Sequence, residues 1–185
     1  TCSKFFELFD STEMKGGKGL RATRNIKAGD EISRESAVMR CPNGHPARSE
    51  DEAEEMHRRC VSDRFAGLTA KKRRAVMDLS SWDKYNNSET GEVTSYGIYQ
   101  TNSLRLTAKD LGDAAIFLAM CRANHSCLPN VHFCWREDLQ KLLIMAFKDI
   151  AVGEELYGTY GPSEPMDTAG RREHLSNEFG FTCMC

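Results

Sequence analysis

The chain of 185 residues lacks several features that would point directly to a function. Its longest hydrophobic run, Ala114 to Cys121, is far shorter than the roughly 20 residues of a membrane-spanning helix. It has no basic excess, since 25 Lys and Arg stand against 27 Asp and Glu, whereas nucleic-acid-binding domains usually carry one. No secretory signal peptide is recognisable. We therefore expect an intracellular protein with no membrane partner and no direct nucleic-acid partner.

The composition that remains is that of an ordinary folded domain. Hydrophobic residues make up 40% and charged residues 28% of the chain, and the length suits a single core. The first residue is Thr1 rather than Met, so we expect a fragment of something longer. Eight cysteines without any sign of secretion predict reduced thiols, most of them buried and some able to bind metal.

Hydrophobic periodicity predicts a fold that is mostly β with an α insertion, of the α+β class. A turn at 27–30 is expected to join two strands in a hairpin. Helical spacing predicts two helices within 48–80, with a break at 67–69 and Thr69 as N-cap of the second. Residues 107–123 begin with a helical signal that Gly112 interrupts, and residues 83–95 read as a loop. The expected strands are 4–10, 19–26, 31–35, 131–135, 142–147 and 155–160, and a last helix is expected at 168–178.

The densest group of unusual residues runs from Arg122 to Asn130 and reads Arg-Ala-Asn-His-Ser-Cys-Leu-Pro-Asn. Alone, it is more typical of a loop whose polar residues cap one another. Three further motifs surround it in a fixed order: Gly16 to Ile26 before it, then Asp149 to Gly161, then Phe179 to Cys185.

In this order and spacing the four motifs resemble the SET domain of protein lysine methyltransferases, and most closely the SET–MYND-type branch, although no MYND finger is found. The resemblance covers Phe5 to Cys185. It implies a fold of small β-sheets with a knot-like C-terminal segment. It also implies a SET domain at 1–182, in which 41–95 is a variable, largely helical insertion, and the start of a post-SET zinc tail at 183–185.

The resemblance implies a protein-lysine N-methyltransferase that transfers methyl from S-adenosylmethionine to a lysine of a protein or peptide. The substrate would be a histone tail or a non-histone protein, and the enzyme would act in the nucleus or cytoplasm, as a chromatin regulator in the first case. The alternative is a catalytically silent SET domain that binds peptides or acts as a scaffold.

The resemblance also assigns roles to individual residues. Tyr160 matches the catalytic tyrosine, which would hold the lone pair of a neutral lysine in line with the methyl group. Cys127, Cys183 and Cys185 match three zinc ligands, and the fourth family cysteine would lie beyond Cys185. Tyr99 and Tyr157 are either channel walls or core aromatics. The residues implied to bind the cofactor are Gly16, Gly17, Lys18, Asn102, Asn124, His125, Phe179 and Phe181.

Two features depart from the family pattern. Gly158 stands where an aromatic residue is usual, and we expect it to leave room for a larger amine. Cys41, His45, His57 and Cys60 have a spacing that a zinc site could use, but the residues between them look helical, so we favour a structural role for them.

Overall fold

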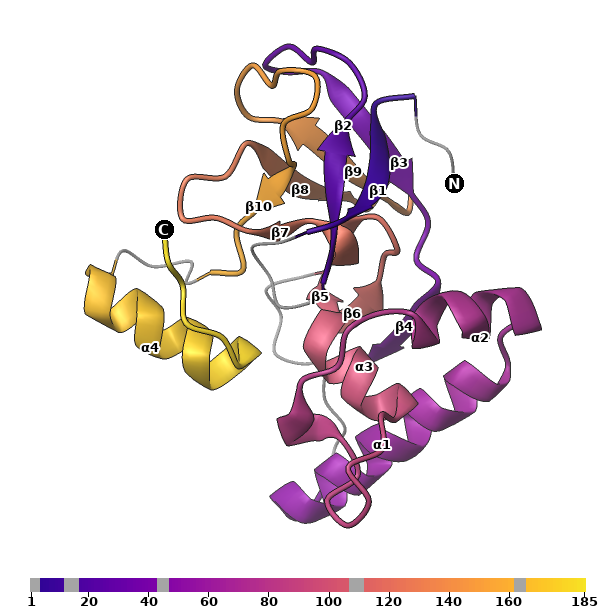
Figure 1. Ribbon diagram of the computed structural model, residues 1–185. Helices are drawn as coiled ribbons and strands as arrows, with labels where there is room; N and C mark the ends of the chain where they lie inside the picture. Colours follow the sequence, from indigo (N-terminus) through magenta and orange to yellow (C-terminus); the bar gives the residue numbers. More distant parts are fainter. Residues whose placement is uncertain (1–3, 12–16, 43–46, 107–111, 162–165) are drawn as a thin grey trace. The chain divides into compact units, whose positions relative to one another are not determined.

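The chain folds into two compact units. The first comprises Thr1–Ser36 and Arg122–Cys185, and the second comprises Ala37–Cys121. We describe each unit by itself. The computed structural model describes residues 4–11, 17–42, 47–106, 112–161 and 166–185 (Figure 1).

The first unit begins with a β-hairpin. Strand β1 (Phe6–Asp10) pairs antiparallel with β2 (Lys18–Ala22), with Phe6 opposite Ala22 and Asp10 opposite Lys18. Leu20 and Ala22 of β2 are buried. Strand β1 lies within the predicted range 4–10, and β2 begins one residue before the predicted range 19–26.

The second sheet of this unit corrects the predicted hairpin. The turn forms at Gly29, whose φ of 89° suits glycine, but β3 (Glu31–Glu35) pairs with β9 (Lys141–Ala146) rather than back with β2. Strand β9 also pairs with β8 (Val131–Arg136), which gives the order β3-β9-β8. A continuous apolar strand such as β9 is most stable in the centre of a sheet, where both of its edges are paired.

Two short segments complete the first unit. Strand β7 (Asn124–His125) pairs parallel with β10 (Tyr157–Gly158), so only two residues of the strand expected at 155–160 form a ladder. Helix α4 (Thr168–Phe179) begins where the Asp167 carboxylate accepts from Gly170 N and ends at Gly180, whose φ is 74°.

The second unit combines a small sheet with the predicted helices. Strands β4 (Met39–Pro42), β6 (Asp113–Ile116) and β5 (Leu104–Arg105) form a sheet in the order β4-β6-β5. The helical signal at 107–123 is therefore wrong for the described part, which holds strand β6 and the short 3₁₀ turn Met120–Arg122. Burial of Ala114, Ala115 and Ile116 in a sheet outweighs their local helix preference.

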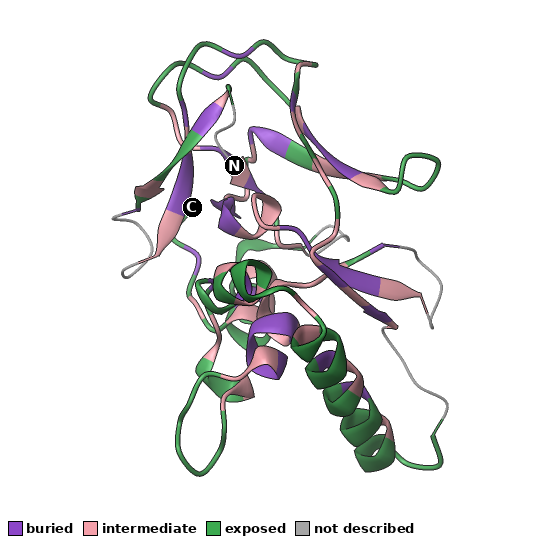
Figure 2. Ribbon diagram, turned by 90° about the vertical axis from the view of Figure 1, so that its right-hand side faces the viewer, coloured by how far each residue is buried: buried purple, intermediate pink, exposed green. Residues whose placement is uncertain are grey.

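The helices of the second unit agree with the sequence where capping signals are present. Helix α1 (Glu50–Ala66) starts at the Ser49 cap, and α2 (Ala70–Met77) starts at Thr69, as predicted. Most of α1 is exposed, and its buried residues His57 and Val61 lie on one side (Figure 2). A 3₁₀ turn η1 (Asp83–Tyr85) and helix α3 (Ser95–Asn102) follow, and α3 was not predicted.

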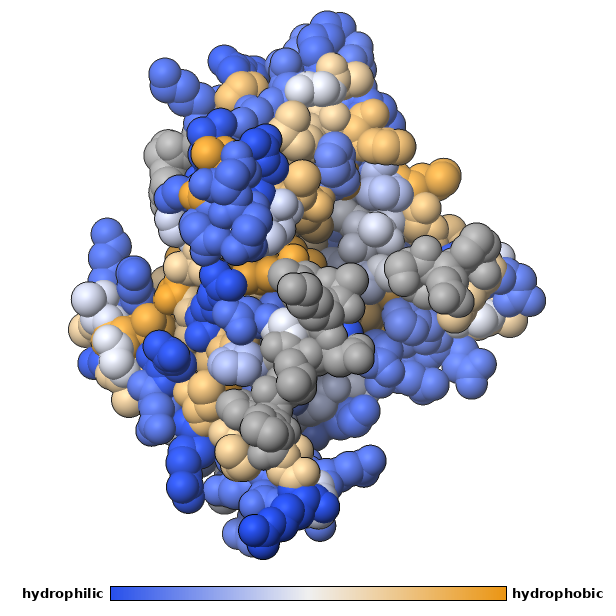
Figure 3. All heavy atoms as spheres, turned by 180° about the vertical axis from the view of Figure 1, so that it is seen from behind, coloured by the Kyte–Doolittle hydropathy of each residue, from blue (hydrophilic) through white to orange (hydrophobic). Residues whose placement is uncertain are grey.

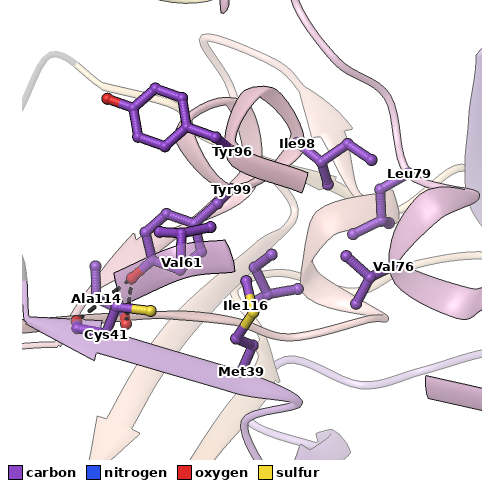
Figure 4. Packing of buried hydrophobic residues seen from close by; sticks show 10 residues of the cluster. All are labelled: Met39, Cys41, Val61, Val76, Leu79, Tyr96, Ile98, Tyr99, Ala114 and Ile116. Carbon is purple, nitrogen blue, oxygen red and sulfur yellow. Dashed lines mark hydrogen bonds between the residues drawn. The ribbon is translucent and has the colours of Figure 1, made fainter. Parts of the chain in front are cut away.

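Tyr99 is the central polar residue in the core of the second unit (Figure 4). Its hydroxyl donates to Ala114 O at 2.7 Å and lies 3.4 Å from Cys41 O, so it joins α3 to β6 and β4. Burial raises the pKa of Tyr99, and the phenol therefore stays a donor. The core cluster comprises Met39, Cys41, Val61, Val76, Leu79, Tyr96, Ile98, Tyr99, Ala114 and Ile116.

The surface drawn in Figure 3 is largely hydrophilic, with apolar residues in small separate areas. Across the described residues, no helix has both the length and the apolar character needed to span a bilayer.

Candidate functional site

The candidate site is built on the parallel pair β7–β10, which brings two of the sequence motifs side by side. Asn124 lies opposite Tyr157, and His125 lies opposite Gly158. Backbone bonds extend the contact, because Ser126 N donates to Gly158 O at 2.9 Å. A polar loop and the segment that leads to Tyr160 are thereby fixed to each other.

Asn130, at the end of the polar motif, fastens this pair from the side. It is 2% exposed, its Nδ2 donates to Glu155 O at 2.7 Å, and its Oδ1 accepts from Tyr157 N at 2.7 Å. The buried amide thus makes the two hydrogen bonds that the backbone of a neighbouring strand would otherwise make to Glu155 and Tyr157. The sequence motif contained Asn130, but its supporting role could not be predicted without the partner segment.

Glu155 is a second residue that the sequence did not single out. Its Oε1 accepts from Asn124 Nδ2 at 2.7 Å. Its Oε2 accepts from the Tyr157 hydroxyl at 2.9 Å and from the Ser11 hydroxyl at 3.4 Å. The carboxylate therefore joins three segments that are distant in sequence. Tyr157 binds this carboxylate through its hydroxyl, which favours a polar supporting role over either predicted role.

The glycine motif approaches the same carboxylate. A Cβ added at Gly19 would lie 2.5 Å from Glu155 Oε1 and 2.7 Å from Phe9 Cε1, so only glycine fits without displacement. Next to it, Gly17 O accepts from Ser11 N at 2.9 Å, and Lys18 begins β2. Gly16 lies outside the described residues.

Three rings gather around Tyr160. The centroids of Tyr160 and His125 are 5.4 Å apart, and those of Tyr160 and Phe179 are 5.0 Å apart. Phe181 lies 5.9 Å from His125 and 6.1 Å from Tyr160. The C-terminal aromatics that the sequence assigned to the cofactor thus lie beside the predicted catalytic tyrosine, with tilted or edge-on geometry that favours ring packing.

Hydrogen bonds define the tautomer of His125 and the orientation of the Tyr160 phenol. Tyr160 N donates to His125 Nδ1 at 3.1 Å, so Nδ1 is an acceptor and the ring proton of the neutral form belongs on Nε2. Burial lowers the pKa of His125, which favours this neutral form. The Tyr160 hydroxyl donates to Ala123 O at 3.1 Å, which fixes the orientation of the phenol.

The three predicted zinc ligands meet at one point beside His125. Ligand atoms of His125, Cys127, Cys183 and Cys185 all lie within 4.8 Å of one another, and Cys127 Sγ is 3.5 Å from Cys183 Sγ. Sulfurs about 2.3 Å from a tetrahedral zinc lie roughly 3.8 Å apart, so the group needs little movement to hold the ion. His125 Nε2 is 3.4 Å from Cys127 Sγ, but it carries the ring proton while Nδ1 accepts from Tyr160 N, so this nitrogen is not a zinc ligand in that state.

Thiol environments in this cluster differ. Burial raises the pKa of Cys183 to about 11. Burial also acts to raise the pKa of Cys185, but hydrogen bonds, the largest of them from Cys127 N, outweigh it and the pKa is lowered. Backbone N–H groups that point at sulfur favour the thiolate, which is the form that binds metal.

The residues of the first unit have the chemistry that the two ends of S-adenosylmethionine would require. At one end, the Glu155 carboxylate packs against the Gly19 backbone and accepts from the Asn124 amide, which offers polar groups to an amino-acid moiety. The rings of His125, Phe179 and Phe181 offer faces and edges against which a purine can pack.

Asn102 belongs to the second unit. Its Nδ2 donates to Ser80 O at 2.7 Å and to Ile98 O at 2.8 Å, so both amide protons serve the backbone of that unit. Its assignment to the cofactor stays a prediction. The buried position of Tyr99 in the core of the same unit favours the core-aromatic interpretation.

The expected room beside Gly158 is filled. A Cβ added at Gly158 would lie 2.5 Å from Phe133 Cε2 and 2.7 Å from Phe133 Cζ. Phe133 of β8 thus supplies an aromatic ring against the position where the family usually has one. The expectation that glycine leaves room for a larger amine at this point is wrong, because the neighbouring strand occupies the space.

The spacing of Cys41, His45, His57 and Cys60 gains no support as a metal site from the part of the chain described. Cys41 is buried, and burial raises the pKa of its thiol to about 12, which disfavours the metal-binding thiolate. His57 and Cys60 lie on α1, and His45 falls outside the described residues.

Comparison with known proteins agrees with the geometry. A family model described as SET domain matches residues 17–161. The chain is 35% identical over 89 residues to the histone-lysine N-methyltransferase set5 of Schizosaccharomyces pombe, covering 48% of this chain and 27% of set5. It is 35% identical over 71 residues to the mouse protein-lysine N-methyltransferase SMYD4, covering 38% of this chain and 9% of SMYD4. The chain therefore spans well under half the length of these curated relatives.

A crystal structure of a candidate histone methyltransferase from Plasmodium falciparum is also similar, with a TM-score of 0.44 and 14% identity over 88% of this chain and 97% of that one. At these values the structural likeness carries no argument, and the assignment rests on the sequence match. Because that match extends over most of the chain and includes the β7–β10 site, the chain belongs to the SET-domain family.

Proposed function

We propose that this chain is the methyl-transferring domain of a protein-lysine N-methyltransferase of the nucleus or cytoplasm. Its substrate would be a lysine side chain of a protein, with histone tails as the first class to test. Support comes from its family and from relatives that are named as histone-lysine and protein-lysine methyltransferases. The observation that carries the proposal is the junction of Asn124, His125 and Tyr160 at the β7–β10 pair.

When bound, S-adenosylmethionine supplies the methyl group that is transferred. In this proposal the backbone of Gly17 and Lys18 and the side chain of Asn124 hold its amino-acid end. His125 and the C-terminal aromatics hold its adenine end. Gly16 and Asn102 complete the predicted set, and Phe179 and Phe181 provide the ring surfaces.

Tyr160 orients the attacking lysine. The lysine must lose a proton before it attacks, although the unperturbed pKa of its ammonium is about 10.4. A site that excludes water lowers that pKa, because the ammonium form is poorly solvated there. Since the Tyr160 proton is engaged by Ala123 O, the phenol oxygen can accept from an amine N–H and align the nitrogen. Alignment of two bound reactants contributes several kcal/mol, about 7 or more in favourable cases.

The proposal includes a structural zinc ion held by Cys127, Cys183 and Cys185. It would tie the tail at 183–185 to the SET domain at 1–182, whose insertion is 41–95. His125 would not fill the fourth position while Tyr160 N donates to its Nδ1, because Nε2 then carries the ring proton. The knot-like threading of the C-terminal segment stays a prediction.

Replacement of Tyr160 by Phe tests the catalytic assignment. We expect methyl transfer to histone peptides, followed with labelled cofactor, to fall at least 100-fold, because the phenol oxygen that aligns the amine is removed. Calorimetric titration should show cofactor affinity within about threefold of wild type, because the ring and its packing remain.

Tyr85→Phe is the matched control, because Tyr85 lies in the second unit and should leave the rate unchanged. An unchanged rate in Tyr160→Phe would overturn the role of this residue. A wild-type chain that binds cofactor and peptide but transfers no methyl group would instead indicate a silent binding domain.

A further inference from the structure

We infer that Glu155 is a positioning residue that fixes the Asn124 amide so that its oxygen receives a cationic amine, the α-ammonium group of the cofactor. The inference rests on the proposed function. It adds a residue that none of the sequence motifs assigned, and a reason for its carboxylate chemistry.

The first argument is the polarity of the Asn124 amide. An amide side chain has one donor end and one acceptor end, and its orientation follows from its partners. Glu155 Oε1 only accepts, so the end that lies 2.7 Å from it is Nδ2. Asn124 Oδ1 must then point the other way. No residue in the described part of the chain donates to this oxygen, which leaves it available to a ligand that carries N–H groups.

The second argument is that Glu155 itself cannot easily turn. Its Oε2 is held by the hydroxyls of Tyr157 and Ser11, and its backbone carbonyl accepts from Asn130 Nδ2. Gly19 has no Cβ, and one added there would lie 2.5 Å from Glu155 Oε1. A carboxylate with donors on both oxygens is pre-organised, so it can hold a neighbouring amide in one orientation.

The third argument is charge. Glu155 has no ion pair among the described residues. The backbone of Arg21 forms a β-bridge with the backbone of Glu155, but the Arg21 guanidinium is paired with Glu7. A half-buried carboxylate without a cation beside it attracts a positively charged ligand. The Asn124 oxygen and the Glu155 charge therefore favour the same group, a protonated amine.

A merely structural Glu155 would hold β7 to β10 and nothing more. The two roles differ in what they predict for ligands. A structural role affects every ligand of the site equally, whereas a positioning role affects only ligands that carry the amine.

The experiment compares two probes by calorimetric titration of the whole chain: S-adenosylhomocysteine, and the same compound without its α-amino group. We expect Glu155→Gln to weaken the binding of S-adenosylhomocysteine at least 10-fold, which corresponds to about 1.4 kcal/mol of binding free energy. The affinity for the deaminated compound should change less than twofold. Glu89→Gln is the matched control, because Glu89 is an exposed carboxylate of the second unit. It should change neither affinity.

A second variant guards against a folding defect. Glu155→Gln combined with Asn124→Asp exchanges donor and acceptor, because the new amide can donate to the new carboxylate. The exchange also keeps an oxygen and a negative charge available to the amine. We expect this double variant to bind S-adenosylhomocysteine within about fivefold of wild type, and Asn124→Asp alone to bind it worse than the double variant does.

The outcomes separate the inference from the proposed function. Equal weakening of both probes by Glu155→Gln, or no weakening of either, would overturn the positioning role while leaving the methyltransferase proposal intact. A wild-type chain that binds neither probe would overturn the proposed function, and the inference with it.

Discussion

At the scale of single residues, two glycines show how close approach rather than turn geometry decides what is tolerated. Gly19 and Gly158 both have negative φ or extended backbone, yet a Cβ at either would lie 2.5 Å from a neighbouring atom. The neighbour at Gly19 is a carboxylate oxygen that the site uses, and the neighbour at Gly158 is the Phe133 ring. The sequence marks such positions only as glycines, because the obstructing atom comes from a distant segment.

The Gly158 contact yields a stability prediction. Gly158→Ala should reduce the free energy of unfolding by about 1–3 kcal/mol, because the added methyl group overpacks the space against Phe133. Combining it with Phe133→Leu should recover part of the loss, since the two residues touch. Urea unfolding followed by circular dichroism measures both effects.

Gly67→Ala provides the control. Gly67 has a φ of −71° and right-handed helical geometry, and an added Cβ there meets its nearest atom at an ordinary 3.5 Å. We expect it to leave stability unchanged or to raise it slightly. Equal losses at the two glycines would show that the Phe133 contact is not what restricts Gly158.

At the scale of elements, helix caps were predicted more accurately than strand pairings. The Thr69 cap and the end of α4 at Gly180 agree with local signals that act within one turn. The partner of β3 and the strand β6 were mispredicted, because pairing depends on segments that lie far away in sequence. Helix α3 has a Thr94 cap, but its small and aromatic residues gave no helical periodicity.

The bond from α3 to its sheet can be tested directly. Tyr99→Phe should cost about 1–3 kcal/mol of unfolding free energy, because buried carbonyls of β6 and β4 lose a donor. Tyr96→Phe, one turn away, removes only an oxygen that accepts from Gln100, and should cost less than about 1 kcal/mol. Thermal and urea unfolding of both variants gives the comparison, and equal costs would contradict the linking role of Tyr99.

At the scale of the whole molecule, the proposed zinc ion joins segments that are far apart in the chain. Cys127 and Cys183 are separated by 56 positions, yet their sulfurs lie 3.5 Å apart. An ion that binds only the folded state stabilises it by mass action. The metal would therefore contribute to folding of the first unit as well as to the order of its tail.

Zinc removal should lower the melting temperature. Zinc at 100 times its Kd stabilises a fold by about 2.7 kcal/mol, which corresponds to a shift of roughly 5–10 °C for a chain of this size. We expect a chelator to lower Tm by a shift of this size. In Cys183→Ser, the chelator should no longer change Tm.

Cys134→Ser, a half-buried cysteine on β8 outside the cluster, should keep the chelator effect intact. A purified chain that contains no zinc by elemental analysis and has a Tm indifferent to added zinc would contradict the site.

The amino-acid sequence by itself determined the family, the order of the motifs and most helix boundaries, because these depend on residue identity, spacing and local hydrogen bonds. It also indicated Tyr160, Asn124 and His125. Only the tertiary structure brought them together and added Glu155, Asn130 and Phe133. Their roles depend on which distant atoms lie within hydrogen-bonding or van der Waals distance, and local sequence carries no record of those distances.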